Sequence, residues 1–128
     1  MKRFLAVLTA LCALSITARA DETAVGHMVF FELKDKSPEA KKKLVDACYK
    51  YLKTHDGVLY FSAGPRAEDA KEKVSATDWD VALHIVFKDA AALKKYITHP
   101  DHLKFIDENK AAWKGVKVYD SHLDPERK

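Results

Sequence analysis

Three side chains of this chain could together move a proton on a small molecule: His27, Tyr96 and His102. The unperturbed pKa of an imidazole is about 6.5, so a histidine can take or give a proton near neutral pH. A tyrosine hydroxyl beside it could polarise a carbonyl group or hold an enolate. The same three residues could instead form a structural network, in which the histidines bond to backbone carbonyls or to Tyr96.

A second arrangement of histidines raises the question of a metal site. His99 and His102 are three residues apart, and Asp101 lies between them. Pro100 starts a new helix at this point, so the two imidazoles need not point toward one another. A zinc site also needs more than two protein ligands in position. The sequence therefore predicts no metal ligands and no cofactor.

The other polar residues form no recognisable catalytic pattern. His84 falls on a strand face that we expect at a subunit contact, whereas His55 and His122 lie near segment ends and are expected to be solvated. Asp120 and Glu32 are single acids on different strands. The chain has no Ser-His-Asp arrangement, glycine-rich phosphate loop or paired-carboxylate motif, which disfavours hydrolase and kinase functions.

Residues 1–20 have the form of a secretory signal peptide. A positive start, Met1-Lys2-Arg3, precedes an apolar run over 4–16, and the small-x-small sequence Ala18-Arg19-Ala20 follows. The run is shorter than the roughly 20 apolar residues that span a bilayer, so it predicts a cleaved leader rather than an anchor. We expect a mature protein that begins at Asp21 and is exported to the periplasm or the medium.

Removal of this segment also removes the surplus positive charge. The chain has 22 Lys and Arg against 19 Asp and Glu, and residues 1–20 contain three of the basic residues and no acid. A balanced mature chain disfavours nucleic acid and anionic membranes as partners, because both require excess Lys and Arg. Cys48 is its single cysteine, so no internal disulfide is possible, and its place on an apolar helix face predicts burial.

The hydrophobic pattern indicates how these residues are positioned. Strands are predicted over 25–33, 58–63, 79–87 and 116–119, and a long polar connection over 66–77, with room for one helical turn, joins the second to the third. One helix begins after Ser37, the next after Asp89, and His99-Pro100 breaks and restarts the latter before a continuation through Trp113. The order βαββαβ predicts an α+β, ferredoxin-like fold, with an antiparallel sheet and helices on one face.

Strand alternation assigns the apolar side chains to the two faces of this sheet. A small-molecule pocket is predicted between sheet and helices, where Tyr96 and His102 approach a lining of five strand residues: His27, Val29, Phe31, Val81 and Leu83. The opposite face carries Met28, Phe30, Ala82, His84 and Val86 and requires a cover. A second copy of the chain would supply it, which predicts a homodimer in the form of a dimeric α/β barrel.

Four segments carry a resemblance to a known family. They are Gly26-His27-Met28-Val29-Phe30-Phe31, Asp56-Gly57-Val58, the segment from Trp79-Asp80-Val81 to Phe87, and Tyr96 with His99-Pro100-Asp101-His102. In this order they resemble the stress-responsive α/β-barrel (Dabb) domains, over about 26–119. The resemblance implies a single Dabb domain over 21–128, a small dimeric protein, and an association with stress.

Around the histidine-proline turn the chain is similar to the plant cyclases of this family that form olivetolic acid. The resemblance places Tyr96 and His102 on the cyclase tyrosine and general-base histidine, and His27 on its first-strand histidine. Val81 stands where those enzymes have a further histidine, which leaves a more apolar pocket. The sequence thus predicts an exported homodimer that binds a small apolar or carbonyl molecule; the alternatives are a cyclase-like lyase using His102 and Tyr96, or a purely structural dimer-forming domain.

Overall fold

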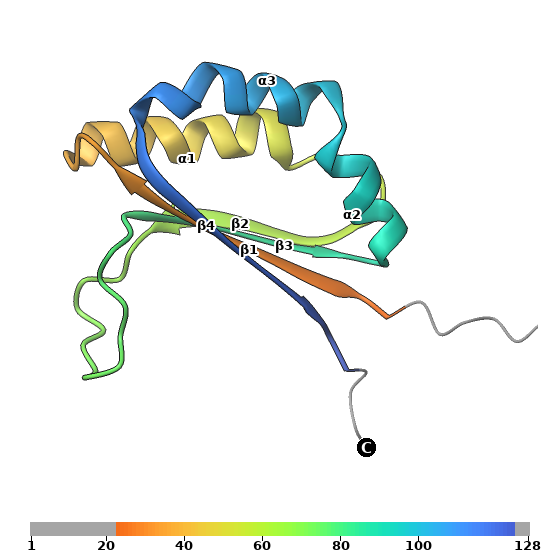
Figure 1. Ribbon diagram of the computed structural model, residues 1–128, viewed down its shortest axis with the longest axis horizontal. Coiled ribbons are helices and arrows are strands. Elements are labelled where there is room, and N and C mark those ends of the chain that lie inside the picture. The colour runs from red at the N-terminus through yellow and green to blue at the C-terminus, as the bar shows by residue number, and fades with distance from the viewer. Residues whose placement is uncertain (1–22, 125–128) are drawn as a thin grey trace, which may run out of the picture.

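The computed structural model describes residues 23–124 (Figure 1), so the predicted signal peptide lies outside the described residues. Four strands are present: β1 (Val25–Leu33), β2 (Val58–Pro65), β3 (Val81–Phe87) and β4 (Trp113–His122). The helices are α1 (Pro38–Leu52), α2 (Ala90–Ile97) and α3 (Pro100–Asn109), followed by a short 3-10 helix, η1 (Lys110–Ala112). The helices lie together on one side of the sheet.

The four strands form one antiparallel sheet in the order β2-β3-β1-β4. β1 lies between β3 and β4, so His27 pairs with Ile85 on one side and with Asp120 on the other. The β1–β4 register shifts between Glu32 and Leu33. This order confirms the predicted ferredoxin-like α+β fold.

Side-chain alternation separates a closed face from an open one. On the closed face, Val29, Phe31 and Leu33 of β1 and Leu83 and Ile85 of β3 are all buried beneath the helices. Cys48 of α1 is completely buried among these residues, as predicted, and burial raises the pKa of its thiol to about 12. An inaccessible thiol with this pKa serves as a small apolar side chain.

Each helix begins at the residue that the sequence predicts. The Ser37 hydroxyl accepts a hydrogen bond from the Ala40 amide, and the Asp89 carboxylate accepts one from the Ala92 amide. Such caps satisfy amide groups that a helix cannot pair internally. α3 begins at Pro100, which tolerates this position because its ring nitrogen has no proton to pair.

Four strand boundaries differ from the sequence predictions, and one of them is the end of β2, which was predicted at Ala63 and lies at Pro65. β3 begins at Val81, and the Trp79 ring instead packs on Phe30 of the open face, so the predicted alternation is wrong at its first residue. Trp113 starts β4 rather than ending a helix, and β4 continues to His122. The connection over 66–80 contains turns and no helix, and Figure 1 shows it projecting past the sheet on the side away from the helices.

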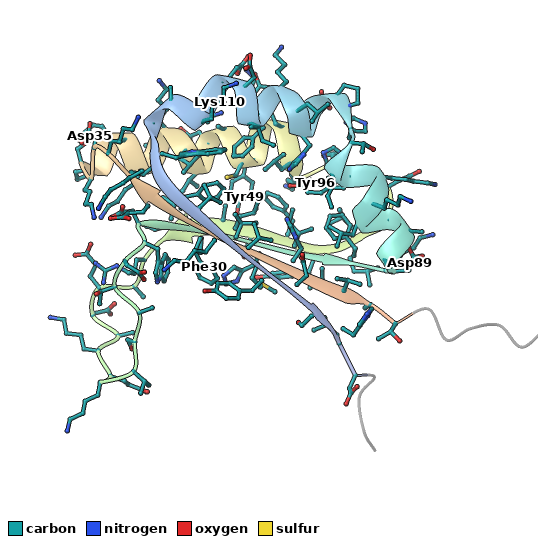
Figure 2. The ribbon with its side chains drawn as sticks, viewed as in Figure 1. Phe30, Asp35, Tyr49, Asp89, Tyr96 and Lys110 are labelled. Atoms are coloured by element: carbon teal, nitrogen blue, oxygen red, sulfur yellow. The ribbon has the colours of Figure 1, made fainter. Side chains whose placement is uncertain are left out.

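The open face centres on an aromatic cluster. Phe30 contacts Trp79, His84 and Tyr119 at ring-centroid distances of 5.0, 6.1 and 5.9 Å. Figure 2 shows Phe30 on this face, opposite Tyr96, which lies between sheet and helices. Within residues 23–124 no helix lies on this face, and none is long and apolar enough to cross a membrane.

Candidate functional site

A cavity of about 280 Å³ lies between the closed face of the sheet and the pair α2–α3. The strands supply His27, Val29, Phe31, Leu83, Trp113, Val116, Val118 and Asp120, and the helices supply Tyr96, Ile97, His102, Phe105 and Ile106. Ile97, Val116 and Val118 are each more than one-third exposed, so they form the rim of the mouth. The lining is apolar apart from His27, Tyr96, His102 and Asp120, the usual composition of a small-molecule site.

Tyr96 lies at the centre of the polar groups. Its ring centroid is 5.7 Å from that of His27 and 4.5 Å from that of His102, and Phe87 packs against it at 5.0 Å. Tyr96 projects from the last turn of α2, His102 from the first turn of α3 and His27 from β1. The structure therefore brings the three sequence-predicted residues to one cavity.

His27 is held by an acid that no sequence pattern singles out. Its Nδ1 lies 2.6 Å from Oδ1 of Asp120, directly across the β1–β4 ladder. Because a carboxylate only accepts, Nδ1 of His27 carries the proton and Nε2 is left to exchange protons with a ligand. The pair is a His-Asp dyad at the edge of the cavity, since His27 is buried and Asp120 is half-exposed.

His102 is oriented in the same way by a backbone group. Its Nδ1 donates to the carbonyl of Ile97 at 2.9 Å, which again leaves Nε2 without a proton in the neutral imidazole. Burial lowers the pKa of His102 below 6.5, and the nearby His27 and His55 lower it further, although the bond to Ile97 opposes this. His102 is therefore a neutral acceptor at pH 7.

Tyr96 is suited to donate rather than to ionise. Burial raises the pKa of its hydroxyl well above the ordinary value of 10, with a smaller contribution from Cys48. No hydrogen bond joins this hydroxyl to another group of residues 23–124, whereas the ring is fixed on several sides. A protonated hydroxyl without a protein partner can donate to a ligand oxygen.

Two further histidines extend the cluster of rings around Tyr96: His55 contacts Tyr96, and His99 contacts His55. The expectation that His55 is solvated is wrong. His55 is half-buried, its Nε2 donates to the Tyr51 carbonyl at 2.9 Å, and its ring meets the Tyr96 ring edge-on at 5.1 Å. The His99 ring contacts His55 at 4.5 Å, and its Nδ1 accepts from the Asp101 amide as the N-cap of α3. A sequence pattern gives no signal for this, because His55 lies in a loop.

The other predicted lining residues differ in whether they reach the cavity. Val29, Phe31 and Leu83 line it, whereas Val81 is completely buried in the core beside Phe31 and does not reach it. Asp120 and Trp113 are lining residues that the sequence did not predict. Across residues 23–124 no three His, Cys, Asp or Glu side chains cluster as metal ligands.

Comparison with known protein families gives one match over most of the chain. Residues 25–123 match the family described as Stress responsive A/B Barrel Domain, or Dabb. The chain belongs to this family. No functionally curated protein matches this Dabb domain by sequence.

Solved structures with the same fold are numerous but distant in sequence. A Dabb family protein with a ferredoxin-like fold from Mesorhizobium loti is 23% identical, with a TM-score of 0.65 over 80% of this chain and 99% of that one. A dimeric ferredoxin-like protein of unknown function from Thermobifida fusca is 16% identical, with a TM-score of 0.66 over 79% and 92%. The hydroxynitrile lyase of Passiflora edulis is 15% identical, with a TM-score of 0.66 over 84% and 99%. These identities establish the fold alone.

Proposed function

We propose that this Dabb domain binds a small carbonyl or phenolic molecule in the cavity beneath α2 and α3. The observation that carries the proposal is the shared orientation of two histidines. His27 and His102 each have Nδ1 engaged, by Asp120 and by the Ile97 carbonyl, so each presents Nε2 beside the buried Tyr96. A ligand that accepts from Tyr96 and donates to an imidazole satisfies both kinds of group.

The apolar lining favours a ligand that is hydrocarbon apart from the polar groups bound to Tyr96 and to an imidazole. Val29, Phe31, Leu83 and Phe105 surround the polar groups with hydrocarbon. Burial of an apolar ligand surface against them supplies most of the affinity, while the few polar groups fix the orientation. A charged or strongly hydrated ligand would lose its water here without compensation.

Native mass spectrometry of protein purified from its own source tests the proposal directly. We expect a retained small molecule, or, when the protein is empty, binding of a phenolic ketone such as 3-hydroxyacetophenone, whose carbonyl can accept from Tyr96 and whose hydroxyl can donate to His102. His102→Ala should weaken binding by about 1–3 kcal/mol, the cost of leaving a buried partner unpaired. His122→Ala, at the exposed end of β4, is the matched control and should leave binding unchanged. Equal effects of the two substitutions would contradict the proposal.

A lyase or cyclase reaction is the second candidate, favoured by the His27–Asp120 dyad. A carboxylate bonded to the Nδ1 proton of an imidazole fixes the tautomer in which Nε2 can accept a proton, as in hydrolytic triads. The hydroxynitrile lyase from Passiflora edulis, which shares this fold, suggests a test. A base would take the hydroxyl proton of a hydroxynitrile, the C–C bond would break to leave an aldehyde, and cyanide would leave with a proton. Benzaldehyde release from mandelonitrile that His27→Ala abolishes would support catalysis, and no release above the buffer rate would leave a binding function.

A homodimer closed through the open face of the sheet is the assembly that we propose. The aromatic cluster around Phe30, together with the half-buried Met28 and Val86, forms an apolar face that soluble monomers rarely expose. The dimeric state described for proteins of the same fold supports it. Light scattering should give twice the chain mass, and a stable monomer at micromolar concentration would contradict the assembly.

Export is a separate proposal, based on the sequence of residues 1–20. The intact mass of protein recovered from periplasm or medium should correspond to a chain that begins at Asp21. The mass of the full chain in that fraction would contradict cleavage.

A further inference from the structure

A second cavity lies end to end with the first one. Its volume is about 460 Å³. Its apolar walls include Leu33, Ala40, Leu44 and Ala112, and charged residues also line it, among them Lys34, Asp35, Glu39 and Lys43. Along β1, residues 27, 29 and 31 face the first cavity and residue 33 faces the second. Trp113 is the one residue that lines both cavities.

The indole of Trp113 therefore forms the partition between the two spaces. It is held by ring contacts, at 5.0 Å from Phe31 and 5.8 Å from Phe105. Its Nε1 is buried and has no hydrogen-bond partner within residues 23–124. Packing alone keeps the ring in place, since no polar contact anchors it.

The polar and apolar groups are ordered along the first cavity. Tyr96 packs against His102 and His27 at one end, while Phe31, Phe105 and Trp113 pack together at the other end. A ligand whose carbonyl oxygen accepts from the Tyr96 hydroxyl would direct an unbranched tail toward Trp113. The tail would end at the indole, because the ring lies between the first cavity and the second.

We propose that Trp113 sets the maximum length of the ligand, an aryl or alkyl carbonyl compound whose apolar tail ends against the indole. This inference rests on the proposed function. Replacement of the indole by a smaller side chain joins the two cavities and admits a longer tail. Trp113 then determines specificity for tail length without touching the reacting carbonyl.

Equilibrium dialysis with a series of phenyl ketones tests the length limit. The wild-type chain should bind butyrophenone more tightly than acetophenone, since each buried methylene raises affinity about fourfold, and should bind octanophenone at least about tenfold more weakly than butyrophenone. Trp113→Ala should bind octanophenone at least about tenfold more tightly than wild type does, and should lose the wild-type preference for butyrophenone over octanophenone. Wild-type protein that binds octanophenone as tightly as butyrophenone would overturn the inference, because the tail would then leave through the mouth.

Two further variants keep the test decisive. Trp113→Leu makes a smaller opening with less loss of packing, and should show the same gain to a lesser extent if Trp113→Ala does not fold. The double variant Trp113→Ala with Ala40→Phe, in which the phenyl ring fills the second cavity from α1, should lose the gain in octanophenone affinity. Its affinity for acetophenone should equal that of Trp113→Ala. If a folded Trp113 variant binds octanophenone no more tightly than wild type does, the inference about Trp113 is overturned but the proposed function is not. Failure of every ketone to bind any of the proteins overturns the proposed function as well.

Discussion

Replacement of Tyr96 by phenylalanine separates a binding role from a structural one. The ring stays, and with it the contacts to His27, His55 and His102 at 5.7, 5.1 and 4.5 Å. The hydroxyl that is removed has no hydrogen-bond partner within residues 23–124. We therefore expect the free energy of unfolding to change by less than about 1 kcal/mol, which corresponds to a shift in Tm of less than about 8 °C.

The effect on ligand binding should be larger. A carbonyl ligand that loses the Tyr96 hydroxyl leaves its own oxygen buried and unpaired, at a cost of about 1–3 kcal/mol. This corresponds to a decrease in affinity of about 5- to 150-fold. Equilibrium dialysis with acetophenone measures the affinity, and thermal unfolding of the empty protein measures the stability.

Tyr51→Phe is the matched control, with the opposite expected pattern. The Tyr51 hydroxyl donates to Glu108 at 2.5 Å and joins α1 to α3, away from the cavity. Its loss should lower the free energy of unfolding by about 1 kcal/mol, because Glu108 is partly exposed, and should leave affinity unchanged. If Tyr96→Phe lowers stability as much as Tyr51→Phe and leaves acetophenone affinity within about twofold, Tyr96 is structural and the reasoning is refuted.

Three other predictions concern the assembly, the pH response and the core. Val86→Asp should convert the dimer to a monomer in light scattering, because a buried unpaired carboxylate costs several kcal/mol; a dimer that persists would place the interface elsewhere. Because folding lowers the pKa of His102, the unfolded chain binds a proton at a higher pH than the folded protein does. The stabilisation from neutral His102 is therefore complete above pH 6.5 and is lost as the pH falls below that value. His102→Gln should remove this part of the acid sensitivity in chemical denaturation, and an identical pH profile would contradict it. With a pKa of about 12, Cys48 should react with a disulfide reagent at pH 8 only after unfolding; rapid reaction of the native protein would show an accessible thiol.

Local sequence signals were sufficient for most of the fold. The bounds of β1, the Ser37 and Asp89 caps and the restart of the helix at Pro100 are all as predicted, because each depends on residues within one turn of the boundary. β4 was predicted too short, since it is an edge strand with exposed Lys114 and Lys117, and therefore lacks the alternation of a covered strand. Its extension to His122 is fixed by pairing with β1.

The candidate site was predictable only where it lies on regular elements. Alternation in β1 turns His27 toward the helices, helical spacing in α2 turns Tyr96 inward, and the restart at Pro100 redirects the chain so that His102 follows. The sequence analysis named Asp120 only as a single acid, because its partner His27 is 93 residues away and the pairing depends on strand register, which no local pattern encodes. The roles assigned to His27, Tyr96 and His102 stay predictions.

The short turn between α2 and α3 limits which sequence changes this protein can accept during evolution. Only Thr98 and His99 separate the two helices, and each residue added or lost in a helix turns the rest of that helix by about 100°. An insertion or deletion between Tyr96 and His102 would therefore rotate His102 away from its carbonyl partner and from the cavity. The connection over 66–80 projects from the other side of the sheet and can change length without this consequence. Diversification of ligand chemistry must then come from point substitutions around the cavity, whereas length variation remains open to the loop.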